Sequence, residues 1–362
     1  MSELQTALLV IGFSVIIAVY VIGWWQQWRY RRKFAATFRT THADVLYQGN
    51  DTQPAARQPE FTQTMESKTV ATPDEAWALP SELPCALLDT RTDFIIELHL
   101  VEPSPGVVLD GLWQRKFDFD KPMQVCGLTL AGKQMTAKQW ERATADGQTL
   151  YTRFRIALQL VDRGGAISVA RLADFRDLVR GIALHIKADT TIPDLDKTHL
   201  QAVELDAFCA AVDQMVGVNL VAQKESLLIG AEIAQAADTQ GMTLEPDGAF
   251  HLLDAQGHSL FRLVNRDTQP FQHHTLNTFI TPGITLLLDV PRVQNPAEHF
   301  DQLMRVAHEL ARQLQVKVVD DHGMALGDSN LARIRAQIAE VEMKMCDHGI
   351  APGGAQAHRL FS

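Results

Sequence analysis

The segment 279–291, "FITPGITLLLDVP", decides the fold of the C-terminal half of the chain, because the apolar run inside it predicts a buried β-strand. Alternate side chains of a strand face opposite sides of a sheet. If Thr285 and Leu287 face outward, then Ile284, Leu286 and Leu288 face the interior. Two interpretations remain open at this point: the sheet only fills a core, or its second face holds a partner.

The segments around this strand predict a small α+β unit. Residues 248–265 contain two apolar stretches on either side of a glycine turn, which is typical of a β-hairpin. A hairpin favours an antiparallel sheet with helices on one face, and such a sheet leaves its other face open to solvent or to a ligand. The remaining segments are predicted as helices at 226–241, 296–315 and 330–345 and as strands at 216–223 and 316–321.

An earlier part of the chain repeats much of this order. Strands are predicted at 93–102, 123–132, 150–162 and 180–188, and a helix at 195–215. Residues 180–223 and 282–321 both run as glycine, strand, acidic loop, long helix and short strand. We interpret them as parts of two tandem copies of one α+β unit; the alternative is a chance similarity of a common pattern.

The N-terminus contains a candidate membrane anchor. Residues 6–25 include no charged side chain, and about twenty helical residues span the hydrocarbon core of a bilayer. Tryptophans at its end stand where an aromatic belt lies, and the basic cluster 29–33 follows. A cleaved signal peptide carries its basic residues in front of the apolar run, so we predict a retained anchor rather than a signal peptide or a core helix. The positive-inside rule then predicts that the C-terminal side lies in the cytoplasm.

Residues 35–87 are predicted to form a flexible linker. They are rich in Gln, Thr, Pro and Ala and hold few aliphatic side chains, so they cannot bury enough surface to offset the entropy of an ordered chain. The cysteines have neither C-x-x-C nor zinc-ligand spacing, and we expect all of them to be reduced thiols. They are Cys85, Cys126, Cys209 and Cys346.

Composition and motifs argue against an enzyme. The formal net charge of −10 argues against a nucleic-acid binder that neutralises phosphates over a broad basic face. The sequence has no P-loop, no G-x-S-x-G elbow and no H-E-x-x-H motif. We expect His273 and His274 to be solvated rather than metal-bound, and residues 320–322 to be the polar end of a strand. We therefore predict no catalytic site, no cofactor and no metal; an enzyme with a site split between the two repeats is the least favoured alternative.

Several segments of the C-terminal half resemble the ZipA cell-division family. They are "GMTLEPDGAFHLLD" (241–254), "LFRLVN" (260–265), "FITPGITLLLDVP" (279–291), "VVDD" (318–321) and the closing amphipathic helix. The similarity covers residues 216–344, and its most specific part is the pattern F-x-T-P-G-[IV]-T. The N-terminal anchor and the linker also match the plan of that family, whereas the upstream repeat is an addition to it.

The resemblance implies a fold, a partner and a location. ZipA proteins are anchored in the inner membrane, and their C-terminal domain lies in the cytoplasm. That domain has a split β-α-β fold, with helices behind one antiparallel sheet. Its free face binds the C-terminal peptide of FtsZ and so tethers the division ring to the membrane.

Matching the motifs residue by residue places six candidate binding residues in this chain. Asp247 and Ala249 fall on the first strand of the expected groove, Val264 and Arg266 on the second, and Thr285 and Leu287 on the third. The family tends to place methionine where this chain has Asp247 and Arg266. A methionine-rich surface adapts to an apolar peptide, whereas a charged surface prefers a partner with charge.

The sequence thus predicts an α+β chain of five parts. These are an anchor with its basic flank at 1–34, a linker at 35–87, a first α+β repeat at 88–223, a ZipA-like FtsZ-binding domain at 216–346 and a tail at 347–362. The expected function is that of a single-pass inner-membrane divisome adaptor at the septum, with a periplasmic N-terminus. The alternative is a membrane-anchored structural divisome protein that uses the same sheet face for self-association or for another partner.

Overall fold

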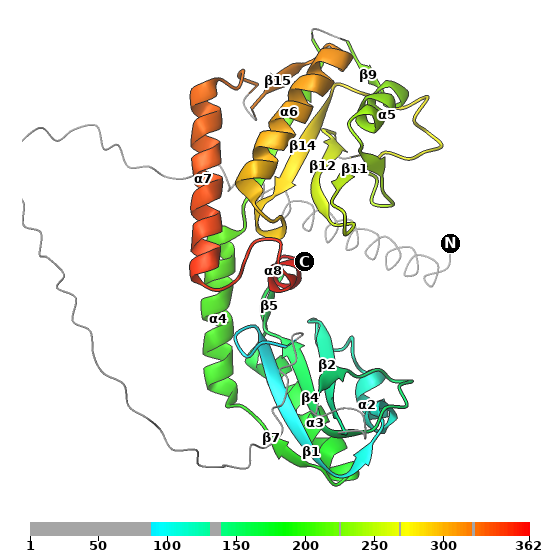
Figure 1. Cartoon of the computed structure of the whole chain (residues 1–362), viewed down its shortest axis with the longest axis vertical. Helices are drawn as coiled ribbons and strands as arrows, with labels where there is room; N and C mark the ends of the chain where they lie inside the picture. The colour runs from blue at the N-terminus through cyan, green and yellow to red at the C-terminus, as the bar shows by residue number, and fades with distance from the viewer. Residues whose placement is uncertain (1–87, 131–138, 224–225, 268, 321–322) are drawn as a thin grey trace, which may run out of the picture. The chain divides into compact units, whose positions relative to one another are not determined.

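The computed structural model of the chain describes residues 88–130, 139–223, 226–267, 269–320 and 323–362 (Figure 1). These residues belong to one compact unit, Trp77–Ser362. The predicted anchor and the predicted linker lie outside the described residues. Among the helices that the structure does describe, none combines the length and the apolar character needed to cross a bilayer.

The first part of the described chain is built on a five-stranded antiparallel sheet with the order β3-β2-β4-β1-β7. Helix α3 (Val169–His185) packs on one face, where the rings of Phe94 and Phe175 meet edge to face at 6.2 Å. The helix begins at Ser168, whose hydroxyl accepts a hydrogen bond from the amide of Arg171. The strands are β1 (Asp93–Ser104), β2 (Met123–Thr129), β3 (Trp140–Arg142), β4 (Tyr151–Gln159) and β7 (Asp189–Thr191).

The strand predicted at 180–188 is wrong, because most of this segment is the last part of α3. Leu172, Phe175, Val179 and Ala183 are buried at intervals of three and four residues, which is the period of a helix face. The apolar stretch of Ile182–Leu184 resembles a strand only when it is considered without the residues before it. The proposed match between residues 180–188 and the strand inside 282–291 is therefore also wrong.

The second part of the chain carries a six-stranded antiparallel sheet with the order β10-β11-β12-β14-β8-β15. Helices α5 (Gly230–Thr239) and α6 (Pro296–Leu314) pack against it, and α7 (Asp328–Asp347) packs on α6. The short strands β9 (Leu228–Ile229) and β13 (Ile280–Thr281) pair separately. The main strands are β8 (Met215–Val221), β10 (Thr243–Leu244), β11 (Phe250–Leu253), β12 (Ser259–Asn265), β14 (Gly283–Asp289) and β15 (Lys317–Val319).

Four strands of each sheet follow the same plan. The order β2-β4-β1-β7 in the first sheet corresponds to β12-β14-β8-β15 in the second, and every neighbouring pair is antiparallel. In both sheets a helix, α3 or α6, joins the second strand of that order to the fourth. A long helix then follows, α4 (Leu195–Val212) after the first sheet and α7 after the second, and these two helices contact each other. We call residues 88–212 the first lobe and residues 213–347 the second lobe.

The last residues of the chain connect the two lobes. Helix α8 (Ala355–Leu360) follows Gly353, whose amide donates to the carbonyl of Pro291 in the second lobe at 2.9 Å. Arg359 forms an ion pair with buried Asp93 of the first lobe, and its carbonyl accepts a hydrogen bond from Gln159. One continuous hydrophobic cluster extends through both lobes and includes the end of the chain.

Arg163 makes a second connection between the lobes. It lies in the turn between β5 (Val161–Asp162) and β6 (Gly165–Ala166). Its guanidinium is 2.7 Å from Asp213, at the end of α4, and 2.7 Å from Asp289 on β14. The same group lies over the ring of Phe361 at 5.9 Å. The turn of the first lobe is thereby joined to the central strand of the second and to the chain end.

The cysteines differ from the expectation of four reduced thiols. Cys126 on β2 is disulfide-bonded, and its partner lies outside the described residues. Cys209 and Cys346 are free. Burial, together with Asp206 and Asp213, raises the pKa of the Cys209 thiol to about 12, so this thiol is not a nucleophile at neutral pH.

Candidate functional site

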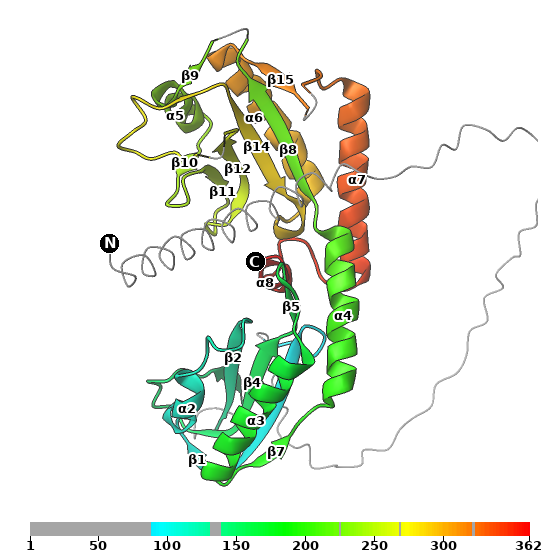
Figure 2. The same cartoon turned by 180° about the vertical axis from the view of Figure 1, so that it is seen from behind.

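Strand β14 separates a core face from a free face in the second lobe. Ile284, Leu286 and Leu288 are completely buried, whereas Thr285 and Leu287 are half-buried. This alternation agrees with the one that the sequence indicates. Figure 1 shows α6 in front of β14, and the opposite view in Figure 2 shows β8 and β14 in front of α6, so the helix covers one face of the sheet.

The segment before β14 holds the strand in place. Thr281 is buried, and its hydroxyl donates to the side-chain oxygen of Asn265 at 2.6 Å and accepts from the amide of Gly283 at 3.2 Å. A Cβ at Gly283 would lie 2.8 Å from the carbonyl oxygen of Leu220, which is closer than real Cβ contacts allow. The T-P-G part of the quoted segment therefore fixes β14 between β12 and β8.

The free face carries a narrow apolar strip across three strands. Leu287 is paired with Arg262 on β12 and Gly217 on β8. A Cβ at Gly217 would come within 3.4 Å of the Leu287 side chain, so the glycine leaves a hollow beside that leucine. In the next row Val264, Thr285 and Asn219 lie side by side, and the Thr285 hydroxyl donates to Asn219 at 2.8 Å. We call this set the free strip: Gly217, Asn219, Val264, Thr285 and Leu287.

The other three predicted site residues lie beside the free strip. Ala249 is only 3% exposed, and the adjacent Gly248 carbonyl accepts a hydrogen bond from the amide of Phe271. Arg266 follows the end of β12 and is exposed, and its amide donates to the carbonyl of Gly283 at 3.2 Å. Asp247 lies in the turn before β11.

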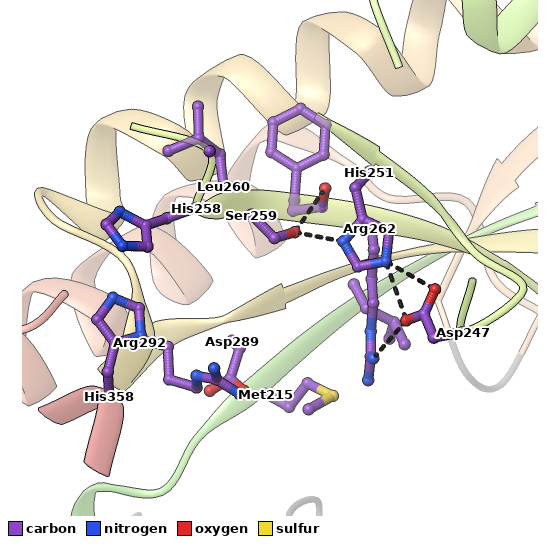
Figure 3. A pocket seen from close by; sticks show the side chains of 13 residues that line it. Met215, Asp247, His251, His258, Ser259, Leu260, Arg262, Asp289, Arg292 and His358 are labelled. Atoms are coloured by element: carbon purple, nitrogen blue, oxygen red, sulfur yellow. Dashed lines mark hydrogen bonds and ion pairs between the residues drawn. The ribbon is translucent and has the colours of Figure 1, made fainter. Parts of the chain in front are cut away.

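A pocket of about 340 Å³ opens at the end of the free strip that lies nearest to α8 (Figure 3). Two of the six predicted residues, Asp247 and Leu287, line it. Ala249, Val264, Arg266 and Thr285 are not among its lining residues. The lining residues that motif matching missed include Met215, His251, His258, Leu260, Arg262, Asp289, Arg292 and His358.

Asp247 belongs to a hydrogen-bonded chain along one wall of this pocket. His251 Nε2 lies 3.0 Å from an oxygen of Asp247, and its Nδ1 lies 2.8 Å from the Ser259 hydroxyl. A carboxylate only accepts hydrogen bonds, so Nε2 carries the proton in this arrangement. Arg262 lies further from the same carboxylate, at 3.8 Å. The predicted site residue Asp247 is thus held by a histidine at the edge of the sheet.

The other wall is formed by residues 290–292 and α8. The rings of His258 and His358 stack with their centroids 5.0 Å apart. Burial, Arg292 and His258 all lower the pKa of His358, and Asp289 and Asp254 only partly oppose them. His358 is therefore mostly neutral at neutral pH. It lies far from β14 in the sequence, so no local motif indicates its place beside the pocket.

The arrangement offers a surface that can bind another molecule. In the part of the chain that the structure describes, no group of three or more His, Cys, Asp or Glu side chains is placed to hold a metal ion. The site combines an apolar floor, a pocket at one end and charged side chains around it. Met215 and Leu260 occupy outward positions of β8 and β12. The two-residue period of those strands would therefore have identified both residues as site candidates from the sequence.

Comparisons with known proteins agree on the second lobe. Residues 214–337 match the family model described as "ZipA, C-terminal FtsZ-binding domain". Several similar curated proteins are named cell division protein ZipA. The one from Ectopseudomonas mendocina (strain ymp) is 23% identical over 172 residues, which are 44% of this chain and 63% of the relative. The one from Pseudomonas aeruginosa (strain LESB58) is 24% identical over 140 residues, 37% of this chain and 48% of the relative.

The match covers part of each protein. The chain spans about half to three fifths of the length of these curated relatives. The matched residues contain the sheet with β14 at its centre, the free strip and α6. Residues 214–337, which lie in the second lobe, are therefore similar to the C-terminal FtsZ-binding domain of the ZipA family.

Proposed function

We propose that this chain is a cell-division adaptor that binds the C-terminal peptide of FtsZ on the free strip of the second lobe. The observation that carries the proposal is the pairing of Leu287 with Gly217 on the face opposite to α6. A leucine beside a residue without a side chain offers an apolar ridge next to a hollow. A short amphipathic segment binds by placing its own aliphatic side chains in such a groove.

The expected affinity follows from the size of the strip. Burying an aliphatic side chain contributes about 1.5–3 kcal/mol. Two or three such side chains on the peptide contribute about 3–9 kcal/mol before the cost of ordering it is subtracted, so we expect a Kd of about 1 μM or weaker. Many chains bound along one FtsZ polymer would add avidity to this modest affinity.

The remaining parts of the proposal concern the rest of the chain. Residues 1–34 act as an inner-membrane anchor with a periplasmic N-terminus, and residues 35–87 act as a tether with a reach of about 40 Å. The two lobes are tandem split β-α-β-like units, which is supported by the matching order of four strands. The protein performs no chemistry of its own. Its role is to hold the division ring at the membrane.

The test is a titration of the full chain with a fluorescent peptide that copies the C-terminus of FtsZ from the same organism. Leu287→Asp is expected to weaken binding at least about 100-fold, because it places a charge in the apolar strip. Ile280→Asp is the control, since Ile280 is an exposed apolar residue on β13, outside the six-stranded sheet. Circular dichroism should show the same fold for both variants.

Two results would contradict the proposal. Unchanged affinity for Leu287→Asp would remove the free strip from the binding site. The second result is a wild-type chain that does not bind the peptide but forms a dimer, and a Leu287→Asp variant that is monomeric. This result would identify the strip as a self-association surface instead.

A further inference from the structure

The end of the pocket beside the free strip brings two arginine side chains together with two aspartates. Arg262 and Arg292 line it together with three histidines, and its only acidic lining residues are Asp247 and Asp289 (Figure 3). Whether the two guanidinium groups are available to a ligand depends on which groups the two carboxylates already bind. The contacts of each charged group decide this.

Both carboxylates have close partners of their own. Asp289 accepts two hydrogen bonds from Arg163, at 2.7 and 2.9 Å, and Arg163 approaches from the first lobe, outside the set of pocket-lining residues. Asp247 accepts from His251 at 3.0 Å and from the amide of Ala249 at 3.1 Å. The hydrogen bonds that the pocket's two carboxylates accept therefore come from groups other than the two arginines.

The two arginines are much less committed. Arg262 approaches Asp247 only to 3.8 Å, beyond hydrogen-bond distance, and its side chain is 38% exposed. Arg292 lines the pocket and, within the described residues, has no ion pair with a carboxylate. Guanidinium groups bind carboxylates through two parallel hydrogen bonds, which makes them selective for this partner.

The arginines adjoin an apolar floor. Leu287 is the direct cross-strand neighbour of Arg262. Met215 is the direct cross-strand neighbour of Asp289, and Arg292 lines the pocket together with both of them. Facing pairs on neighbouring strands have Cβ atoms about 5 Å apart. A ligand that buries an aliphatic side chain against Leu287 therefore has its adjacent residues within reach of Arg262.

We infer that the segment bound on the free strip carries an acidic residue next to its aliphatic ones, and that Arg262 and Arg292 bind this carboxylate at the pocket end. This inference rests on the proposed function, since it specifies the chemistry of the peptide that the same strip binds. It gives the charged residues of the groove a role in selecting the partner. An apolar peptide without a carboxylate fits the floor but leaves both guanidinium groups without a carboxylate that accepts two hydrogen bonds.

The experiment compares two forms of the FtsZ C-terminal peptide with the full chain and three variants. One peptide keeps its acidic residues, and in the other each Asp is replaced by Asn and each Glu by Gln. Arg262→Gln and Arg292→Gln are each expected to weaken binding of the acidic peptide about tenfold and to leave binding of the amide peptide unchanged. Arg335→Gln, on the exposed surface of α7, is the matched control and should change neither affinity.

A second pair of probes separates this inference from the proposed function. A designed peptide with two leucines and two aspartates is compared with its lysine counterpart. Preference for the aspartate peptide, lost in Arg292→Gln, supports the carboxylate site even if the FtsZ peptide fails to bind. Binding of the FtsZ peptide that both arginine variants leave intact supports the proposed function and overturns this inference. Equal binding of aspartate and lysine probes would overturn it as well.

Discussion

The two lobes share a strand order but present different free faces. In the second lobe the centre of that face holds Thr285 hydrogen-bonded to Asn219, with Leu287 beside it. In the first lobe the centre holds Glu97, paired across the strands with Arg155. The same architecture therefore supports an apolar strip in one lobe and an ionic cluster in the other.

The ionic cluster of the first lobe is internally compensated. Arg155 lies 3.2 Å and Arg153 3.5 Å from oxygens of Glu97, and His99 lies at 3.7 Å. Arg155 also lies over the ring of Trp140 at 4.2 Å, a favourable cation–π position. These residues satisfy one another, so this face offers neither an apolar ridge nor an unoccupied charge like that of Arg292.

The difference teaches that the inward residues maintain the fold while the outward ones determine what is bound. Ile96 and Ile156 in the first lobe and Leu286 in the second point to the helices and are completely buried. Any set of side chains on the other face is compatible with those contacts, provided that its polar groups are satisfied. Function is therefore argued from the free strip and not from the strand order.

The largest effect is expected in the core that both lobes share. Leu286→Ala and Ile156→Ala each remove a fully buried side chain and should lower the free energy of unfolding by about 2–5 kcal/mol. Since one hydrophobic cluster runs through both lobes, urea denaturation followed by circular dichroism should show one transition, shifted in both variants. The outward neighbour Leu287→Ala is the control and should cost less than about 1.5 kcal/mol. Two transitions, each moved by only one variant, would show that the lobes unfold independently.

The next effect concerns the contact between the lobes. Arg163→Ala leaves Asp213 and Asp289 without their shared cation and should cost about 2–3 kcal/mol, between the values for exposed and buried ion pairs. Burial by itself would lower the pKa of Arg163, but hydrogen bonds to Asp289 and Asp213 raise it overall, so the group stays charged at every practical pH. Thermal unfolding of this variant and of the exposed control Arg335→Ala measures the difference. Equal melting temperatures would mean that Arg163 does not stabilise the lobe contact.

The sequence predicted the second lobe better than the first, for physical reasons. Strong signals lie close together in the second lobe: a hairpin at 248–265, a strand inside 279–291 and a helix at 296–315, all of which the structure contains. In the first lobe the apolar end of α3 has the sequence pattern of a strand. Only the three-to-four-residue spacing of the buried side chains along the whole segment shows that it is helical. The repeat was inferred from a wrong pairing of residues 180–188 with the strand inside 282–291, since α3 corresponds to α6 by strand order.

The candidate site was predictable only along its strands. The two-residue period placed Thr285 and Leu287 on one face and Ile284, Leu286 and Leu288 on the other without any structure, and the structure shows that the first face is the outer one. The pocket beside them needs Arg292 from the turn after β14 and His358 from the last helix, which tertiary packing alone brings together. Ala249 matches the motif but is buried, because a motif match carries no information on what packs over a residue.

A smaller effect should distinguish the two free faces directly. Glu97→Gln leaves Arg153 and Arg155 without their shared carboxylate and should cost about 1 kcal/mol at low salt. This cost should fall in about 1 M NaCl, because salt screens the repulsion between the arginines. Thr285→Val, at the centre of the second face, removes a neutral hydrogen bond and should show no salt dependence. Urea denaturation at low and high salt measures both, and equal salt responses would contradict the contrast between the faces.

The smallest effect should come from the histidine that links α8 to the second lobe. Burial, Arg292 and His258 lower the pKa of His358 in the folded chain below its unfolded value, so the unfolded chain binds more protons in this range. Stability should therefore fall as the pH drops through about 6.5, the ordinary pKa of histidine. Between about pH 7.5 and about pH 5.5 we expect an additional loss of about 1–2 °C in Tm compared with His358→Asn, which cannot gain this proton.

The matched control for this measurement is His274→Asn, because His274 is exposed in a loop between β12 and β13. That variant should keep the pH dependence of the wild-type chain. If His358→Asn also keeps it, the acid sensitivity arises elsewhere. Protonation of His358 also adds a positive charge to the pocket end that Arg292 lines, so the affinity of the wild-type chain for an acidic peptide should rise over the same pH range relative to that of His358→Asn.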